Sequence, residues 1–152
     1  MCGLPLDIDD GEKIVRVVMC PSHVKNGVLK PAAFRSKAGT DEVSVIRHSH
    51  MGSDFCKAKG LAISANSTAI TYGGLAVLTA IAIRQTGSDV YDSRIEFCGH
   101  AHISHGITLA PGEPPTSADF EFITERCRNL LKSTKYHPDP EPSANTWTGP
   151  MI

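Results

Sequence analysis

The sequence predicts a single α+β domain with a mixed or mainly antiparallel sheet. The chain has 152 residues, which is enough for one domain and too short for two. Short runs rich in β-branched residues alternate with turn-forming segments, as strands and turns do. The clearest helical pattern lies near the C-terminus and predicts an amphipathic helix on one face of the sheet. We place the domain at residues 1–137 and a Pro-rich tail at 138–152, docked on the domain or on a partner.

The N-terminal part predicts one strand and one irregular segment. Residues 12–19 are rich in β-branched residues and stop just before Pro21, which is typical of a strand. Residues 28–34 contain Pro31, which suits an edge segment or a loop better than a central strand.

The next part predicts a second strand and a short helix. Residues 42–50 alternate in character, which favours a strand. Residues 51–60 can form a short helix, with Ser53 as its N-cap and Gly60 as its end. Residues 61–71 are rich in Ser, Ala, Asn and Thr and are expected to form a loop.

A buried segment follows at residues 75–78. Thr79 can cap a short helix over residues 80–86 that Gly87 ends. A continuous helix over residues 75–86 is the competing interpretation.

The last third predicts a strand and the main helix. Residues 94–103 alternate between small or apolar and polar residues, as a half-buried strand does. A helix follows from Ser117, with acidic residues in its first turn and basic residues toward its end. We expect the core to contain Leu75, Val77, Ile81, Ile95, Phe97, Phe120, Ile123, Leu130 and Leu131.

Composition excludes several classes of protein. The formal net charge is −1, so a globally basic nucleic-acid binder is not favoured, although residues 25–59 hold seven Lys and Arg against three Asp and Glu. The start of the chain lacks a secretory signal pattern, and the longest apolar stretch, residues 75–83, is too short to span a membrane. Five scattered Cys argue against a disulfide framework. These observations predict a cytoplasmic protein.

Histidine and cysteine form the most suggestive pattern. On a strand, Cys98, His100 and His102 would share one face, and His50 could join them from a neighbouring strand. These side chains are zinc ligands, so zinc is the cofactor that this pattern would take. The competing interpretation is a solvated strand face on which His is simply an acceptable polar residue.

A second hypothesis uses histidine without a metal. His100 would act as general base with His48 and His50 assisting, and Arg16 or Arg47 would hold a phosphate or carboxylate. Such a site could process RNA or another phosphoester. Arg on a strand is also common as plain surface charge.

Several short segments together resemble a diffuse group of small bacterial hypothetical proteins. In this sequence the segments are Arg16, Pro21–Val24, Ala32–Phe34, Ser44–Val45, Gly74–Ala80 and His100–Ile103. The resemblance implies a bacterial source and no particular activity. It singles out His100, because position 102 of the last segment can be any residue and His105 lies beyond it.

The tail gives the interaction hypothesis. Trp147 stands alone among Pro, Ser and Thr, and an isolated Trp is costly to leave in water. It could anchor the tail on its own domain, on a second copy or on another protein. We therefore expect a small regulatory, immunity or defence-associated subunit that acts through protein contacts, with a His-based enzyme around His100, His48 and His50 as the alternative.

Overall fold

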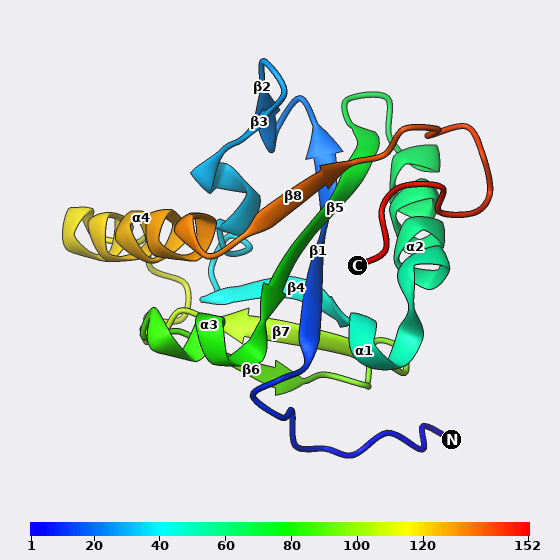
Figure 1. The fold of residues 1–152 in the computed structure, drawn as a ribbon. Helices are drawn as coiled ribbons and strands as arrows, with labels where there is room; N and C mark the ends of the chain where they lie inside the picture. The colour runs from blue at the N-terminus through cyan, green and yellow to red at the C-terminus, as the bar shows by residue number, and fades with distance from the viewer.

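The computed structural model describes residues 1–152 and contains a six-stranded sheet in which every neighbouring pair is antiparallel (Figure 1). The predicted α+β class is confirmed. The strand order is β6-β7-β4-β1-β5-β8. The strands are β1 (Lys13–Cys20), β4 (Glu42–Arg47), β5 (Thr71–Thr79), β6 (Asp89–Asp92), β7 (His100–Ser104) and β8 (Lys135–Pro138).

Helices cover both faces of this sheet, and a small hairpin stands apart from it. The hairpin is β2 (Val24–Lys25) with β3 (Val28–Leu29). The helices are the 3-10 turn η1 (Pro31–Phe34), α1 (His48–Met51), α2 (Ser53–Ala65), α3 (Ala80–Gln85) and α4 (Ser117–Lys132).

Strand β1 shows how the two faces are divided. Ile14 and Val18 belong to the core that also holds the buried residues of η1, α3 and α4. Val15, Val17 and Met19 belong to a second core with residues of α2 and β5. This alternation follows from the two-residue repeat of a strand.

The two central strands of the sheet, β4 and β1, share few residue pairs. β1 pairs with β5 along its whole length but with β4 at only two positions, Ile14 with Arg47 and Val15 with Ile46. Beyond these pairs the two strands separate, and β1 and β5 run steeply across β4 and β7 (Figure 1). The sheet therefore consists of two three-stranded halves, β6-β7-β4 and β1-β5-β8, with an opening between them.

Three predicted elements are confirmed. The first strand is β1, and the short helix α3 begins after Thr79, whose hydroxyl accepts a hydrogen bond from the Ala82 N–H. The C-terminal helix α4 begins at Ser117 after a capping box formed by Thr116 and Asp119.

The second predicted strand and the helix after it have different bounds. β4 ends at Arg47, and His48 and His50 lie in α1, so the strand prediction over residues 42–50 is wrong at its end. Helix α2 continues through Gly60 to Ala65 and fills half of the expected loop. Gly60 does not end the helix but lets it pack closely, because a Cβ there would lie 2.5 Å from the Tyr72 ring.

The strand predicted over residues 94–103 is also only partly correct. β6 ends at Asp92, whose carboxylate accepts a hydrogen bond from the Arg94 main-chain N–H and turns the chain. β7 begins at His100, so Cys98 lies in the turn. There Cys98 forms a disulfide with Cys2, which the scattered cysteine spacing did not predict.

The expected core is partly confirmed. Leu75, Ile123 and Leu130 are buried, whereas Val77, Phe97 and Leu131 are partly buried. Ile81, Ile95 and Phe120 are exposed, and Ile95 is 91% exposed because it lies in the turn before β7.

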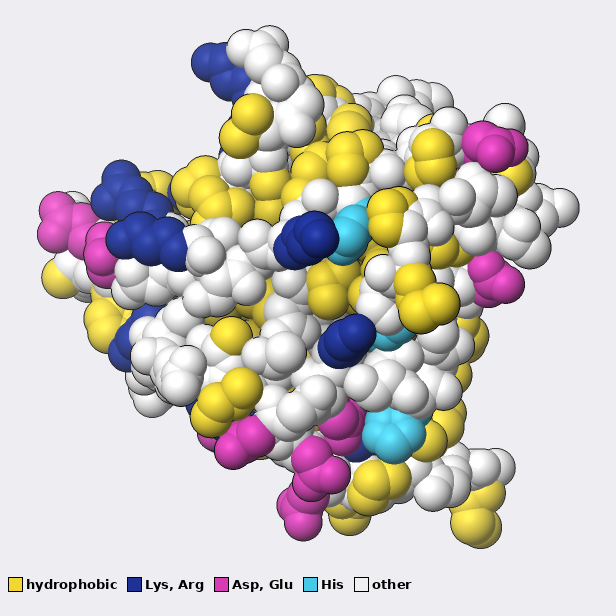
Figure 2. All heavy atoms as spheres, viewed as in Figure 1, with side chains coloured by type: hydrophobic (Ala, Val, Ile, Leu, Met, Phe, Trp, Pro, Cys, Tyr) yellow, Lys and Arg dark blue, Asp and Glu magenta, His cyan; other side chains and the backbone are white.

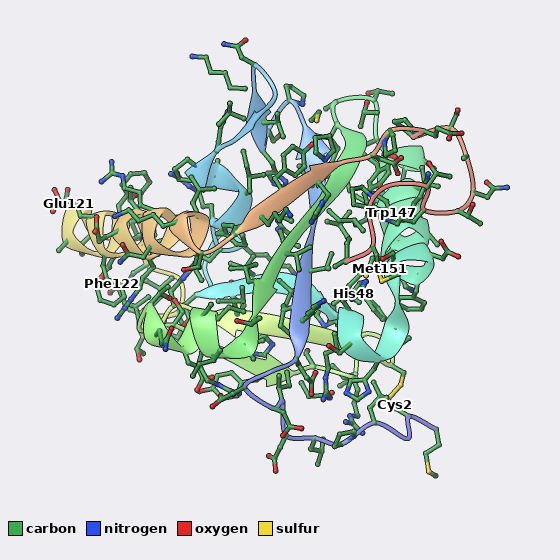
Figure 3. All side chains as sticks on the ribbon, in the orientation of Figure 1. Cys2, His48, Glu121, Phe122, Trp147 and Met151 are labelled. Carbon is green, nitrogen blue, oxygen red and sulfur yellow. A yellow bond between two sulfur atoms is a disulfide. The ribbon has the colours of Figure 1, made fainter.

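Residues after β8 lie against helix α2. The Lys57 ammonium is 3.0 Å from the Asp139 carboxylate, and both side chains are fully buried. The same ammonium donates to the carbonyl oxygens of Glu141 and Thr146. Trp147 packs beside α2 (Figure 3), and its main-chain N–H donates to Asp54. Strand β8 was not predicted, because its few residues precede a segment with many prolines.

No helix is both long and apolar enough to cross a bilayer.

Candidate anion-binding pocket

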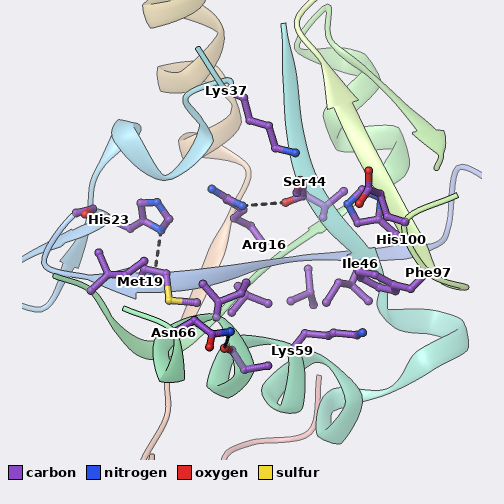
Figure 4. Close-up of a pocket in the computed structure, with 18 residues that line it drawn as sticks. Arg16, Met19, His23, Lys37, Ser44, Ile46, Lys59, Asn66, Phe97 and His100 are labelled. Atoms are coloured by element: carbon purple, nitrogen blue, oxygen red, sulfur yellow. Dashed lines mark hydrogen bonds between the residues drawn. The ribbon is translucent and has the colours of Figure 1, made fainter. Parts of the chain in front are cut away.

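A cavity of about 530 Å³ occupies the opening between β1 and β4 (Figure 4). Helix α2 forms one wall, and the turn before β7 contributes Glu96 and Phe97. The fold places the cavity here because the two strands pair at only two positions and then diverge. We call it the central pocket.

The lining of the central pocket combines an apolar surface with several cations. The charged and titratable lining residues are Arg16, His23, Lys37, Lys59, Glu96 and His100. The apolar ones include Val15, Val17, Met19, Ile46, Ile63 and Phe97. A lining of this kind suits a ligand that has both a negative charge and an apolar part.

Arg16 is the distinctive residue of the pocket. Its Nε donates to the Ala33 carbonyl at 2.8 Å and its Nη1 to the Ser44 carbonyl at 3.0 Å. These bonds hold the guanidinium across the gap where the strands have separated. No carboxylate lies within salt-bridge distance of it. Burial lowers the pKa of Arg16 to about 10, so the group stays charged at neutral pH.

Part of the Arg16 guanidinium is free to contact a ligand. Its Nη2 makes no hydrogen bond to the protein. Among the side-chain nitrogen and oxygen atoms without a hydrogen-bond partner, His48 Nδ1 is the one that is fully buried. Since Nη2 of Arg16 also has no partner, it is not fully buried and can be reached from solvent. Arg16 therefore offers an unused donor to the central pocket.

His100 presents a basic nitrogen to the same pocket. Its Nδ1 lies 3.1 Å from the Ser93 carbonyl, which can only accept, so Nδ1 carries the proton and Nε2 the lone pair. Burial lowers the pKa of His100 and outweighs the Ser93 carbonyl and the Glu96 carboxylate, which both raise it, so the ring is neutral at pH 7. The ring packs edge-on against Phe97 with centroids 5.0 Å apart.

His23 has the opposite arrangement. Its Nδ1 accepts a hydrogen bond from the Met19 main-chain N–H at 3.0 Å, so the neutral ring carries its proton on Nε2. Burial, with the nearby charges of Arg16 and Lys30, lowers the pKa of His23 to about 4. Figure 4 shows Arg16 between His23 and His100. The pocket thus holds one neutral His that accepts and one that donates.

Of the residues predicted to be catalytic, Arg16 and His100 meet in the central pocket, whereas Arg47 and His48 lie elsewhere. Arg47 is completely buried and binds the carboxylates of Glu12 and Asp92. His48 lies in α1, near the start of α2 (Figure 3), and its Nε2 is 2.8 Å from the Ser53 hydroxyl. Arg47 therefore stabilises the fold and has no free charge for a substrate.

The structure does not assemble the predicted zinc ligands. No group of three or more His, Cys, Asp or Glu side chains is placed to hold a metal ion. Cys98 is bonded to Cys2, and His50 lies 3.4 Å from the Glu12 carboxylate. His102 lies on the same strand as His100 but outside the central pocket, 3.9 Å from the Glu42 carboxylate. The metal hypothesis required one continuous strand from Cys98 to His102, and the turn before β7 removes it.

Four charged or titratable pocket residues were not predicted as site residues: His23, Lys37, Lys59 and Glu96. The two lysines belong to the basic segment 25–59, so its charge excess was the available signal. On the face shown in Figure 2, basic, acidic and apolar side chains are interspersed rather than gathered into one basic surface.

No protein family, curated protein or solved structure matches this chain.

Proposed function

We propose that this protein binds a small organic anion in the central pocket, with Arg16 as the anchor for the negative charge. The observation that carries the proposal is the guanidinium without a carboxylate partner. A buried cation is costly unless an anion neutralises it. Arg47 and Lys57, whose side chains are fully buried, both have such partners in the protein.

The apolar lining supports an organic anion rather than a simple inorganic one. Val17, Ile46 and Phe97 contribute apolar surface beside the charged groups. Ligand pockets of small molecules typically have volumes of roughly 300–1,000 Å³. The central pocket falls within this range.

Thermal unfolding with benzoate and with phenyl phosphate tests the proposal. At constant ionic strength, we expect at least one of these anions to raise the Tm of the wild-type protein above its value in chloride, because a ligand that binds only the folded state stabilises it. Arg16→Gln keeps a side-chain donor but removes the charge, and should abolish the shift. Lys132→Met removes a cation from the exposed end of α4 and should leave it intact. The proposal is wrong if neither anion shifts the wild-type Tm, or if Arg16→Gln responds equally.

A second candidate function is general-base catalysis on the bound anion. The specific observation is the free Nε2 lone pair of His100 in the same pocket as Arg16. In hydrolysis of a phosphodiester, His100 would take a proton from water as the water oxygen attacks phosphorus. The P–O bond to the leaving group then breaks, and the group departs as an oxyanion such as p-nitrophenolate. With bis(p-nitrophenyl) phosphate, we expect His100→Gln to lower the release of p-nitrophenolate at least tenfold while binding persists. Equal rates of p-nitrophenolate release by the wild-type protein and His100→Gln would exclude His100 as general base.

The hypothesis of an interaction protein stays a prediction. Trp147 contacts its own α2 and donates through Nε1 to the Pro150 carbonyl. These contacts use the side chain that was expected to anchor a partner, so this hypothesis has less support than the central pocket.

A further inference from the structure

We propose that the anion is a dianionic phosphate monoester of a compact apolar or aromatic alcohol. This inference rests on the proposed function and names the ligand class of the same pocket. A phosphate monoester carries close to two negative charges above pH 7, whereas a carboxylate carries one.

The charge of the pocket fits a dianion. Arg16, Lys37 and Lys59 supply three cations, and Glu96 is the one carboxylate in the lining, so two positive charges remain without a counter-charge. None of the three cations forms a salt bridge in the protein. The neutral His23 and His100 add hydrogen-bonding groups without adding charge.

The cations come from different walls of the pocket. Arg16 lies on β1, Lys59 on α2, and Lys37 in the segment before β4. Figure 4 shows Arg16 and Lys37 both reaching toward Ser44. Cations on several sides can bind the three terminal oxygens of a phosphate at once. A carboxylate has only two oxygens and would contact fewer of these cations.

The remaining lining fits an apolar group attached to the phosphate. Ile46, Ile63 and Phe97 lie around the same cavity. The Lys59 ammonium lies 4.0 Å from the centre of the Phe97 ring, so this cation and this aromatic surface are adjacent. A ligand with its phosphate near Lys59 would place its apolar group near Phe97.

Calorimetric titration at pH 8 with three probes tests the inference. Phenyl phosphate and benzoate share an aromatic ring and differ in charge, and inorganic phosphate lacks the ring. We expect phenyl phosphate to bind at least about tenfold more tightly than either of the other two probes. Lys37→Met and Lys59→Met should weaken the binding of phenyl phosphate severalfold and the binding of benzoate much less. Lys132→Met should weaken the binding of neither probe.

Each alternative outcome is decisive. Benzoate binding as tightly as phenyl phosphate would overturn the phosphate inference and leave the organic-anion proposal standing. Inorganic phosphate binding as tightly as phenyl phosphate would overturn the requirement for an apolar group. Failure of both phenyl phosphate and benzoate to bind would overturn the proposed function itself.

Discussion

Three cations with buried or partly buried charges use their surroundings in different ways. Arg47 and Lys57 have no exposed side-chain surface and bind carboxylates from distant parts of the chain. Arg16 binds only carbonyl oxygens of Ala33 and Ser44. The first two therefore stabilise the fold, whereas Arg16 retains a charge for an external partner.

The Lys57–Asp139 pair predicts a large effect on stability. Lys57→Met would leave the fully buried Asp139 without its counter-charge and should lower the free energy of unfolding by about 3–5 kcal/mol. The Tyr72 hydroxyl would still donate to Asp139. Urea unfolding measures the change. The double variant Lys57→Met/Asp139→Asn removes both charges and should recover at least half of the loss; no recovery would contradict this account.

His23 predicts a pH dependence of stability. Its pKa is about 4 in the folded protein, against an ordinary value of 6.5. Between these values the unfolded chain binds more protons than the folded one, so stability from neutral His23 is complete above about pH 6.5 and is lost as the pH falls toward 4.

Replacement of His23 by Asn tests this dependence. The Asn oxygen can accept the Met19 N–H and does not titrate, so the variant should lose stability less steeply between pH 6.5 and 4. Urea unfolding across this range provides the slopes. Identical slopes for the two proteins would show that His23 is not responsible.

At the level of elements, close packing of α2 on the sheet depends on Gly60. A Cβ at this position would lie 2.5 Å from the Tyr72 ring and 2.6 Å from the Val17 side chain. Gly60→Ala should therefore lower the free energy of unfolding by about 1–3 kcal/mol, although Ala is the better helix former. Chemical denaturation checks this. At exposed Ala58 the reverse change, Ala58→Gly, should cost about 1 kcal/mol. A stabilised Gly60→Ala protein would contradict the packing argument.

Elements with local signals were predictable, and those decided by tertiary packing were not. β1, α3 and α4 have a β-branched run, a capping Thr and a capping box within their own residues. Gly60 looked like the end of a helix because its true role depends on Tyr72, which lies on another element. The turn before β7 was hidden because Asp92, rather than a Gly or Pro pair, turns the chain.

Two residues of the candidate site were predictable from the sequence, but their proximity was not. Arg16 and His100 were both candidates, but their meeting depends on the separation of β1 and β4, which no local pattern encodes. His23 was missed because its role as a hydrogen-bond donor in the pocket depends on the bond that its Nδ1 accepts from the Met19 main-chain N–H. The sequence does not show this bond.

At the level of the whole molecule, the disulfide ties the N-terminal segment to the turn that closes the pocket. Cys2 and Cys98 are 96 residues apart in sequence, and a cross-link over a long loop removes much entropy from the unfolded chain. Cys2→Ser should lower the free energy of unfolding by about 2–4 kcal/mol. The same substitution should also weaken the binding of phenyl phosphate, because the pocket residues Glu96 and Phe97 lie next to Cys98 in the chain.

Urea unfolding with and without a reducing agent tests this prediction. The reduced wild-type protein should match Cys2→Ser, which should not respond to the reductant. Cys20→Ser removes a free thiol and keeps the disulfide, so it should depend on the reductant as the wild-type protein does. Insensitivity of the wild-type protein to reductant would contradict it. Disulfides are typical of oxidising compartments, so the cytoplasmic location remains an expectation from the sequence alone.

The separation of β1 and β4 also has a consequence for amide hydrogen exchange. Central strands usually exchange most slowly, and these two are the third and fourth of six. Their facing edges nevertheless share only two residue pairs. We expect amide protons on these edges to exchange faster than those between β1 and β5, and to slow when an anion fills the gap. The slowest-exchanging amide protons of this protein should thus lie between β1 and β5, next to the middle of the sheet, rather than between β1 and β4 at the middle itself.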